Sequence, residues 1–366
     1  MIDSIILEGF KCFCEKTIIP LSQITILYGK NGRGKSSAVQ SLLLLGQTMR
    51  ANNSVENLLL VGNFVGLGTF NDVKNIKSDI DEFKISLVNT EEKVHMSFCR
   101  YPDKLQLAKL SGLAVNGDDR FNTKTDETGK DKTESKLVGT TSDVILLQNL
   151  KSMQYVAAGR LGPVNSVARN DSMPEDWIGV NGENVINVLS NQSPDFIAAV
   201  EKALSKILSG AAVKINYKDA DRIELFLNSH DGKEVFKPVN VGFGYSYVLP
   251  VIVAALMAKK GSLLIIENPE AHLHPAAQSR LMKFLIDTTM KKDLQLIVES
   301  HSDHVVNGMR IAMKDKIMSP TKGHIVYFSD EEGDPIQVIT SDANGTLSDY
   351  PDDFMDEWTA QMLKLV

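Results

Sequence analysis

Three short runs of apolar residues stand out from the pattern of hydrophobic and polar positions, at residues 24–28, 262–266 and 294–298. Each run is continuous, as in strands that are covered on both faces of a parallel sheet. A helix is expected after each run, beginning near Ser36, at Pro275 and after Ser302 as N-cap. The pattern therefore predicts an α/β fold in which these runs are strands of a central sheet.

A different pattern, alternation of apolar and polar residues, predicts half-buried strands at residues 83–88 and 94–98. Residues 117–141 have no apolar periodicity, and their mixed charges predict a solvated, mobile loop over residues 124–136. Residues 195–208 return to helical spacing. The expected organisation is a core from residues 1–60 and 240–366, a β-rich insert over residues 61–145 and a helical lobe over residues 146–239.

The segment after the first apolar run reads Gly-Lys-Asn-Gly-Arg-Gly-Lys-Ser, a complete P-loop between a predicted strand and a predicted helix. Glycines let backbone N–H groups turn inward around phosphates, and the helix N-terminus adds partial positive charge. We expect Lys35 to reach the β- and γ-phosphates of ATP and Ser36 to offer its hydroxyl to Mg²⁺. The alternative is a glycine-rich turn without a ligand. The residues expected to contact the nucleotide are Gly29, Asn31, Gly32, Gly34, Lys35, Ser36 and Ser37.

The second apolar run ends in an acid, Glu267, which is followed by Asn268, Pro269 and Glu270. Ligands of α/β sheets bind at the carboxyl ends of the strands. Glu267 is therefore expected to hold Mg²⁺ beside the P-loop, which is the Walker B role. An acidic strand end without a metal is the alternative.

The third apolar run leads to His301. A histidine at the tip of a neighbouring strand can reach a γ-phosphate. Taken alone, a satisfied loop histidine is the simpler interpretation, but the other two motifs favour the phosphate role.

Together, the P-loop, residues 267–275 and residues 299–304 resemble the OLD-like (overcoming-lysogenization-defect-like) ABC-type ATPases of prokaryotic defence systems, which are related to SMC-type heads. Similarity at residues 7–13 and 155–163, among others, extends the resemblance over nearly the whole chain, although it is thin between residues 79 and 143. The resemblance implies a P-loop head with a mixed central sheet, and it makes His301 the switch histidine.

The resemblance also implies a dimer that sandwiches ATP, with the P-loop of one subunit facing a signature motif of the other. Glycines and a small hydroxyl at the start of a helix can donate hydrogen bonds to a γ-phosphate. Residues 240–247 fit that description, although they depart from the usual Ser-Gly-Gly form, and a plain turn before a buried helix is the alternative. The candidate signature residues are Asn240, Gly242, Gly244 and Ser246.

A departure from the family pattern concerns catalysis, because ABC-type heads usually carry a second acid where this chain has Asn268. An amide can orient water but cannot accept its proton at neutral pH. Glu270 is the candidate substitute. The sequence therefore supports ATP binding more firmly than fast hydrolysis, with Glu267, Asn268, Glu270 and His301 as the candidate catalytic residues.

Three functions fit these features. The first is a sensor or regulatory ATPase subunit of an anti-phage defence system, triggered by DNA or a phage component and controlling a separate effector such as a nuclease or toxin. The second is a DNA repair or recombination ATPase of the RecF type, in which the closed dimer clamps DNA. The third is a nucleotide-stabilised scaffold with little turnover, which Asn268 favours.

The C-terminal nuclease domain of OLD nucleases is not expected here, since residues 314–366 predict only two strands and a terminal helix. The acidic residues 330–334 are interpreted as a hairpin turn and not as a nuclease centre. Histidine pairs at residues 272 and 274 and at residues 301 and 304 could bind zinc, but the ATPase motifs already explain them.

Composition and charge limit the binding partners and the location that we expect for the protein. The net charge of −7 argues against broad nucleic-acid binding by the monomer. The apolar segment 248–258 is too short for a bilayer, and no signal peptide is evident, so we expect a cytoplasmic protein without membrane contact. Cys12, Cys14 and Cys99 are expected to be reduced thiols, with the first two on alternate positions of a strand.

Overall fold

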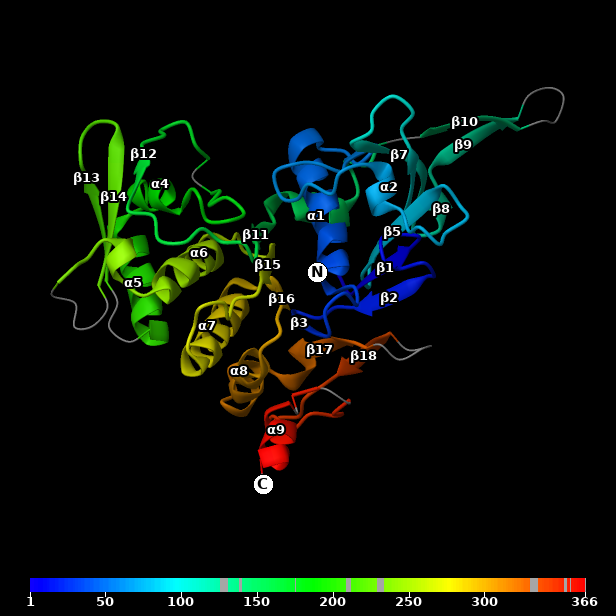
Figure 1. Ribbon diagram of the computed structural model, residues 1–366. Coiled ribbons are helices and arrows are strands. Elements are labelled where there is room, and N and C mark those ends of the chain that lie inside the picture. Colours follow the sequence, from blue (N-terminus) through cyan, green and yellow to red (C-terminus); the bar gives the residue numbers. More distant parts are fainter. Residues whose placement is uncertain are drawn as a thin grey trace. The chain divides into compact units, whose positions relative to one another are not determined.

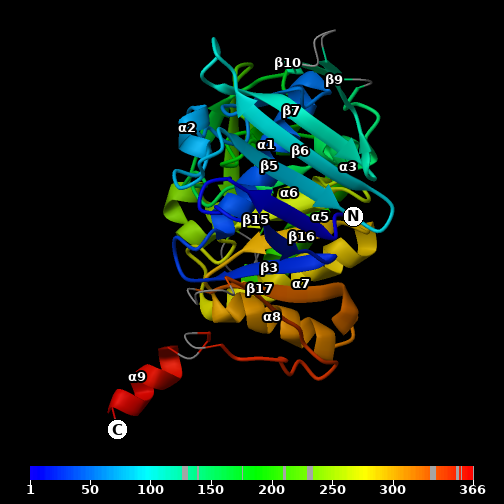
Figure 2. The same ribbon diagram turned by 90° about the vertical axis from the view of Figure 1, so that its right-hand side faces the viewer.

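The computed structural model describes residues 1–125, 131–137, 140–174, 176–208, 212–228, 234–329, 335–351, 354–355 and 357–365. The chain divides into two compact units (Figures 1 and 2). The first comprises Met1–Ser22, Lys30–Met153 and Phe328–Gln337. The second comprises Gln23–Gly29, Gln154–Tyr327 and Val338–Val366. This partition differs from the expected one, because the P-loop helix shares a unit with the β-rich insert.

The first unit is built on a seven-stranded antiparallel sheet with the order β2-β1-β5-β6-β7-β4, in which β8 also pairs with β7. Figure 2 shows β5, β6 and β7 side by side. The strands are β1 (Ser4–Glu8), β2 (Thr17–Pro20), β4 (Asn57–Leu59), β5 (Glu82–Val88), β6 (Lys93–Arg100), β7 (Leu107–Val115) and β8 (Asp118–Asp119). The half-buried strands expected at residues 83–88 and 94–98 are thus confirmed.

Three expectations about this unit were wrong. The first strands belong to this antiparallel sheet and not to the central one, since β1 alternates buried and half-buried residues as one-sided strands do. Part of the expected loop over residues 117–141 forms β8 and a hairpin of β9 (Phe121–Thr125) and β10 (Asp131–Leu137). The sequence of β9 and β10 is mostly polar, so hydrophobic periodicity cannot detect these strands.

The third wrong expectation concerns Cys12. It lies in a two-residue turn with Lys11, closed by paired backbone hydrogen bonds between Phe10 and Phe13 (3.0 and 2.8 Å). Lys11 has φ +48°, as tight hairpin turns require. All three cysteines are free.

The helices of the first unit are α1 (Lys35–Asn52), α2 (Phe70–Val73), α3 (Ile145–Asn149) and the 3₁₀ turn η1 (Leu150–Ser152). The long helix α1 is buried along most of its length, including its polar residues Gln47 and Thr48. Gln47 donates to Leu59 O (2.9 Å) and Thr48 accepts from Leu59 N (2.9 Å). These bonds satisfy the buried groups and fix the P-loop helix to the end of β4.

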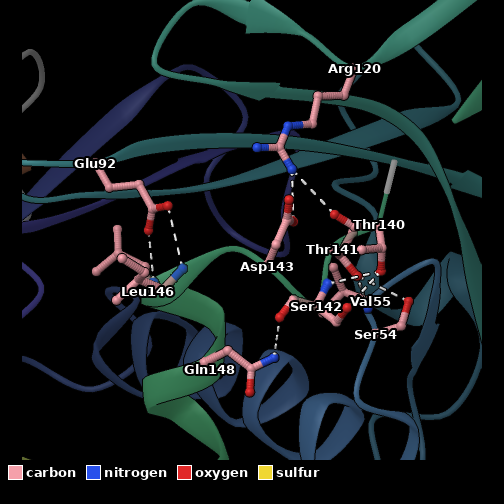
Figure 3. Close-up of polar contacts among 11 residues, drawn as sticks. Ser54, Val55, Glu92, Arg120, Thr140, Thr141, Ser142, Asp143, Leu146 and Gln148 are labelled. Carbon is pink, nitrogen blue, oxygen red and sulfur yellow. Dashed lines mark hydrogen bonds and ion pairs between the residues drawn. The ribbon is translucent and has the colours of Figure 1, made fainter. Parts of the chain in front are cut away.

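A polar network joins residues 140–148 to other parts of this unit (Figure 3). The buried Thr141 hydroxyl accepts from Val55 N (3.0 Å), just beyond the end of α1. Glu92 accepts from the first backbone amides of α3, including Leu146 N at 2.8 Å, and so caps that helix. Arg120 ties the connecting segment by donating to Asp143 (2.8 Å).

The second unit contains a six-stranded sheet with the order β11-β15-β16-β3-β17-β18. The three apolar runs of the sequence are its neighbouring parallel strands β3, β15 and β16, as predicted. Glu267 pairs with Glu299 and Glu299 with Leu27, so the two acids end adjacent strands at one edge. The strands are β3 (Ile24–Gly29), β11 (Gln154–Val156), β15 (Leu263–Glu267), β16 (Gln295–Glu299), β17 (Gly323–Phe328) and β18 (Ile336–Ile339).

The region expected to be a helical lobe contains helices and, in addition, an antiparallel sheet of β12 (Ser166–Ala168), β14 (Arg222–Leu227) and β13 (Val213–Tyr217). Val213–Tyr217 (VKINY) and Arg222–Leu227 (RIELFL) do alternate apolar and polar residues over most of their length, so this signal was present in the sequence and was missed. Helix α7 packs against α5, α6 and α8 (Figure 1). The helices and 3₁₀ turns are α4 (Val185–Ser190), α5 (Pro194–Leu208), η2 (Pro238–Asn240), α6 (Phe243–Met257), α7 (Pro275–Lys292), α8 (Asp303–Lys314), η3 (Pro320–Lys322) and α9 (Glu357–Leu365).

The helices expected to begin at Pro275 and after Ser302 are confirmed as α7 and α8. The acidic residues 330–334 lie outside the described residues, between β17 and β18. Among the described helices, none combines the length and the apolar character needed to span a bilayer.

Candidate functional site

Residues 29–36, called the phosphate loop from here on, connect β3 to α1 where the sequence predicts a P-loop. Its glycines adopt positive φ values, +126° at Gly29, +76° at Gly32 and +111° at Gly34. A β-carbon on Gly34 would lie 2.6 Å from Phe13 Cζ, so this position requires glycine for space as well as for its backbone angle. The loop therefore has the glycine-dependent backbone that the motif predicts.

The start of α1 differs from the starts of the helices that follow the other two strands. No side chain caps α1, and no acidic residue lies in its first turn. By contrast, the side chains of His274 and Ser302 cap α7 and α8. A helix start with neither cap nor acid suits an anionic ligand, because backbone N–H groups and the helix dipole both favour negative charge there. The residues present fit a nucleotide phosphate.

The side chains of the phosphate loop divide by exposure. Lys35 is buried, and its Nζ donates to Lys30 O (2.6 Å), which holds the ammonium group over the loop. Ser36 and Asn31 are exposed. The Cys12 thiol donates to the Ser37 hydroxyl, with 3.7 Å between Sγ and Oγ. Lys35 is therefore positioned by the loop itself, while Ser36 is a solvent-exposed residue at the start of α1.

Glu267, the expected Walker B acid, turns toward β11. Its Oε2 accepts from Ala158 N (3.2 Å), and the Tyr155 hydroxyl bonds to the same carboxylate. Burial raises the pKa of Glu267, and these two hydrogen bonds partly oppose that rise. Protein donors thus already engage this carboxylate.

No group of three or more His, Cys, Asp or Glu in a metal-binding arrangement occurs among the described residues. Magnesium in nucleotide sites needs one or two protein ligands besides the phosphates, so this finding does not test the magnesium prediction.

Glu270 lies in the loop of residues 268–274 that follows β15, called the acid loop from here on. Hydrogen bonds from Ala271 N to Asn268 O (3.1 Å) and from Leu273 N to Glu270 O (3.0 Å) shape this loop. Glu270 Oε1 accepts from His301 N (3.0 Å), whereas its Oε2 is buried and has no hydrogen-bond partner. The structure thus brings Glu270 and His301 together and leaves one desolvated carboxylate oxygen for a water or an ion.

Tyr28 and Asp303 extend this cluster, and the sequence analysis did not select either of them. The Tyr28 hydroxyl donates to Asp303 Oδ1 at 2.6 Å. Burial, followed by the bond to Asp303, raises the pKa of Tyr28, and Glu270 is close enough to add to the rise. Tyr28 ends the apolar run before the phosphate loop, so its position was visible, but its partner was not.

Arg160 is a second site residue that the sequence did not single out. Its guanidinium donates to Ala157 O (3.0 Å), Glu267 O (2.8 Å) and Asn268 O (2.5 Å). Only 3% of Arg160 is exposed, and burial lowers the pKa of its guanidinium to about 10. This arginine fixes the backbone where β15 passes into the acid loop.

The candidate signature residues lie at the start of α6. Asn240 and Gly242 are exposed, and a β-carbon on Gly244 would lie 2.9 Å from His272 O. The Ser246 hydroxyl is buried without a hydrogen-bond partner and lines a small apolar cavity of about 70 Å³ in its own unit, together with Leu161, Val185, Ile186 and Leu249. Asn240 and Gly242 are thus presented to solvent, while the Ser246 hydroxyl is not.

Family comparisons match three parts of the chain. Residues 113–307 match the family described as "AAA domain, putative AbiEii toxin, Type IV TA system". Residues 1–155 match an AAA ATPase domain, and residues 319–365 match a protein family of unknown function, DUF3696. A comparison with curated protein sequences gives no match.

Solved structures of Smc heads are similar to the whole chain. An Smc head bound to the C-winged helix domain of ScpA is 16% identical with a TM-score of 0.56, over 93% of this chain and 97% of that one. An Smc head with an extended coiled coil, bound to the C-terminal domain of ScpA and derived from Pyrococcus furiosus, is 12% identical with a TM-score of 0.53, over 100% and 99%. The predicted fold class, an α/β P-loop ATPase head, is confirmed.

Proposed function

Because this chain belongs to the AAA-domain family described as putative AbiEii toxin of type IV TA systems, we propose that it binds Mg-ATP and hydrolyses it slowly. Lys35 would hold the β- and γ-phosphates and Ser36 the magnesium ion. The uncapped start of α1 and the three positive-φ glycines support this assignment.

The observation that carries hydrolysis is the geometry of Glu270. One carboxylate oxygen is held by the backbone of His301, and the other is buried and unpartnered. A fixed carboxylate with one available oxygen can orient a water and accept its proton, which Asn268 cannot do. Glu270 is therefore our candidate for the water-activating acid, and His301 for the group beside the γ-phosphate.

We also propose that Glu267 binds magnesium, although its carboxylate is already hydrogen-bonded within the protein. To bind magnesium, its carboxylate would exchange the bonds from Ala158 and Tyr155 for the ion. That exchange costs two hydrogen bonds but relieves a buried charge. It provides one physical reason why turnover would be slow.

We place this ATPase in an OLD-like anti-phage defence system, as a sensor or regulatory subunit that controls a separate effector. The family description, which names a toxin and a type IV toxin–antitoxin system, supports a defence setting. The Smc heads that share the fold are described as bound to a domain of ScpA, which supports a protein partner for a head of this kind. A dimer would place Asn240 and Gly242, both exposed, against the nucleotide of the partner subunit.

A nucleotide-stabilised scaffold is the second candidate, because Asn268 replaces an acid and Glu267 is held by protein donors. A RecF-type DNA clamp is the third candidate. ATP-dependent binding of DNA by the purified protein would support it. Because the net charge is −7, DNA binding would require a local basic surface.

The test is to measure mass by light scattering and phosphate release for the purified protein, with and without Mg-ATP. ATP-dependent dimerisation with turnover, both lost in Lys35→Ala, supports an ATPase engine. Constant mass with bound ATP and no phosphate release supports the scaffold instead. Absence of nucleotide binding would overturn the proposed function altogether.

A further inference from the structure

The start of α6 contacts the acid loop through a cluster of rings. The rings of Phe243, Tyr247 and His272 all contact one another, with centroids 5.7 Å apart for Phe243 and His272, 4.3 Å for Tyr247 and His272, and 6.5 Å for Phe243 and Tyr247. Gly244 allows this approach, because a β-carbon there would meet His272 O at 2.9 Å. The first turn of α6 and the acid loop therefore contact each other through both backbone and aromatic side chains.

Arg160 continues this contact to the end of β15. The guanidinium carbon lies 5.7 Å from the centre of the Tyr247 ring, within cation–π range. The same guanidinium donates to the carbonyls of Glu267 and Asn268. A continuous set of contacts thus joins the α6 start, through Tyr247 and Arg160, to the backbone that carries Glu270.

The acid loop has a backbone that needs such support. Asn268 and His272 have φ values of +44° and +61°, a region that non-glycine residues seldom occupy. Such conformations persist only when surrounding contacts hold them. Arg160 holds Asn268 through its carbonyl, and the rings of Tyr247 and Phe243 hold His272.

We infer that Arg160 is a positioning residue for hydrolysis: with Tyr247 it ties the geometry of the acid loop, and hence the placement of Glu270, to the start of α6. A guanidinium fork suits this task because it fixes two neighbouring carbonyls at once, which a lysine ammonium does less rigidly. This inference rests on the proposed function, since it assigns Glu270 to hydrolysis. It concerns how fast bound ATP is cleaved and not how tightly ATP is bound.

Variants of Tyr247 give the sharpest test, because they leave the buried arginine in place. We expect Tyr247→Leu to lower kcat about tenfold with little change in KM, since it removes the ring that contacts both Arg160 and His272. Tyr247→Phe keeps the ring and should behave as the wild type. Loss through KM alone, or equal kcat for the leucine and phenylalanine variants, would overturn the inference.

Arg160→Lys tests the other end of the contact. We expect a fall in kcat similar to that of Tyr247→Leu, with the melting temperature monitored because a buried arginine is being replaced. If both residues act on one loop, the double variant should lose no more than the more impaired single variant. Additive losses would mean that the two residues act separately.

A readout independent of turnover separates this inference from the proposed function. Hydrogen exchange of the peptide covering residues 268–274 reports its amide bonds, including that from Asn268 N to Glu299 O (2.8 Å). We expect Tyr247→Leu to speed exchange there and Tyr247→Phe not to. Faster exchange without ATPase activity in the wild type would refute hydrolysis but keep the contact. Unchanged exchange would refute the contact itself.

Discussion

The phosphate loop follows β3 and the acid loop follows β15, two parallel strands on either side of β16, yet the two loops are held in different ways. The phosphate loop takes its shape from glycines at positive φ and from a lysine that bonds to its own loop. The acid loop also has residues at positive φ, but these are Asn268 and His272, and they are held by a distant arginine and by rings from α6. One loop is specified locally and the other by its surroundings, so single substitutions should affect them differently.

The largest effect is expected from Lys35→Ala in the phosphate loop. The substitution removes the ammonium group that we propose contacts the phosphates, so ATP affinity should fall about 100-fold or more. Calorimetric titration with Mg-ATP measures this affinity. Arg33→Ala, which removes an exposed positive charge from the same loop, is the matched control and should cost far less.

Glycine substitutions separate the local backbone requirement of this loop from its packing against Phe13. A methyl group on Gly34 meets Phe13, whereas one on Gly32 meets open space, although both residues have positive φ. We expect Gly34→Ala to weaken ATP binding about 30-fold and Gly32→Ala about fivefold, since a left-handed non-glycine residue costs about 1 kcal/mol. Equal affinities for the two variants would show that packing against Phe13 has no role.

The smallest effect concerns the pH dependence of stability at Glu267. Because burial raises the pKa of this carboxyl, the folded state binds its proton more tightly than the unfolded chain does. Its contribution to stability is therefore fully present below the ordinary carboxyl pKa and is lost as pH rises through the raised value. Glu267→Gln keeps an acceptor for Ala158 N without the buried charge.

Thermal unfolding should accordingly show Glu267→Gln melting about 2 °C above the wild type at pH 8, with the difference vanishing toward pH 4. The exposed Glu91 provides the control, since Glu91→Gln should melt as the wild type does at both pH values. A lower melting temperature for Glu267→Gln at pH 8 would mean that the charge itself stabilises the fold.

The difference between local and distant contacts also explains which parts of the structure could be predicted from the sequence. Continuous apolar runs identified β3, β15 and β16, because strands buried on both faces leave that record in the sequence. The phosphate loop was predictable residue by residue, since its determinants are consecutive. The hairpin of β9 and β10 was not, because its sequence is mostly polar and shows no apolar periodicity.

The partners around the acid loop were beyond the sequence for another reason. Arg160 lies 107 and 108 positions from Glu267 and Asn268, whose carbonyls it binds, and Tyr28 lies 275 positions from Asp303. No local pattern encodes such pairings. The candidate acids could therefore be selected from the sequence, while the groups that contact them and the backbone around them could not.

The most direct test of the account is the nucleotide state of Glu270→Gln after incubation with Mg-ATP. Glutamine keeps an acceptor for His301 N but cannot take a proton from water, so bound ATP should persist and phosphate release should fall about 100-fold or more. Chromatography of the bound nucleotide measures this outcome. ATP retained by the variant and ADP recovered from the wild type is the predicted result. ADP formed by the variant at the wild-type rate would contradict the role of Glu270.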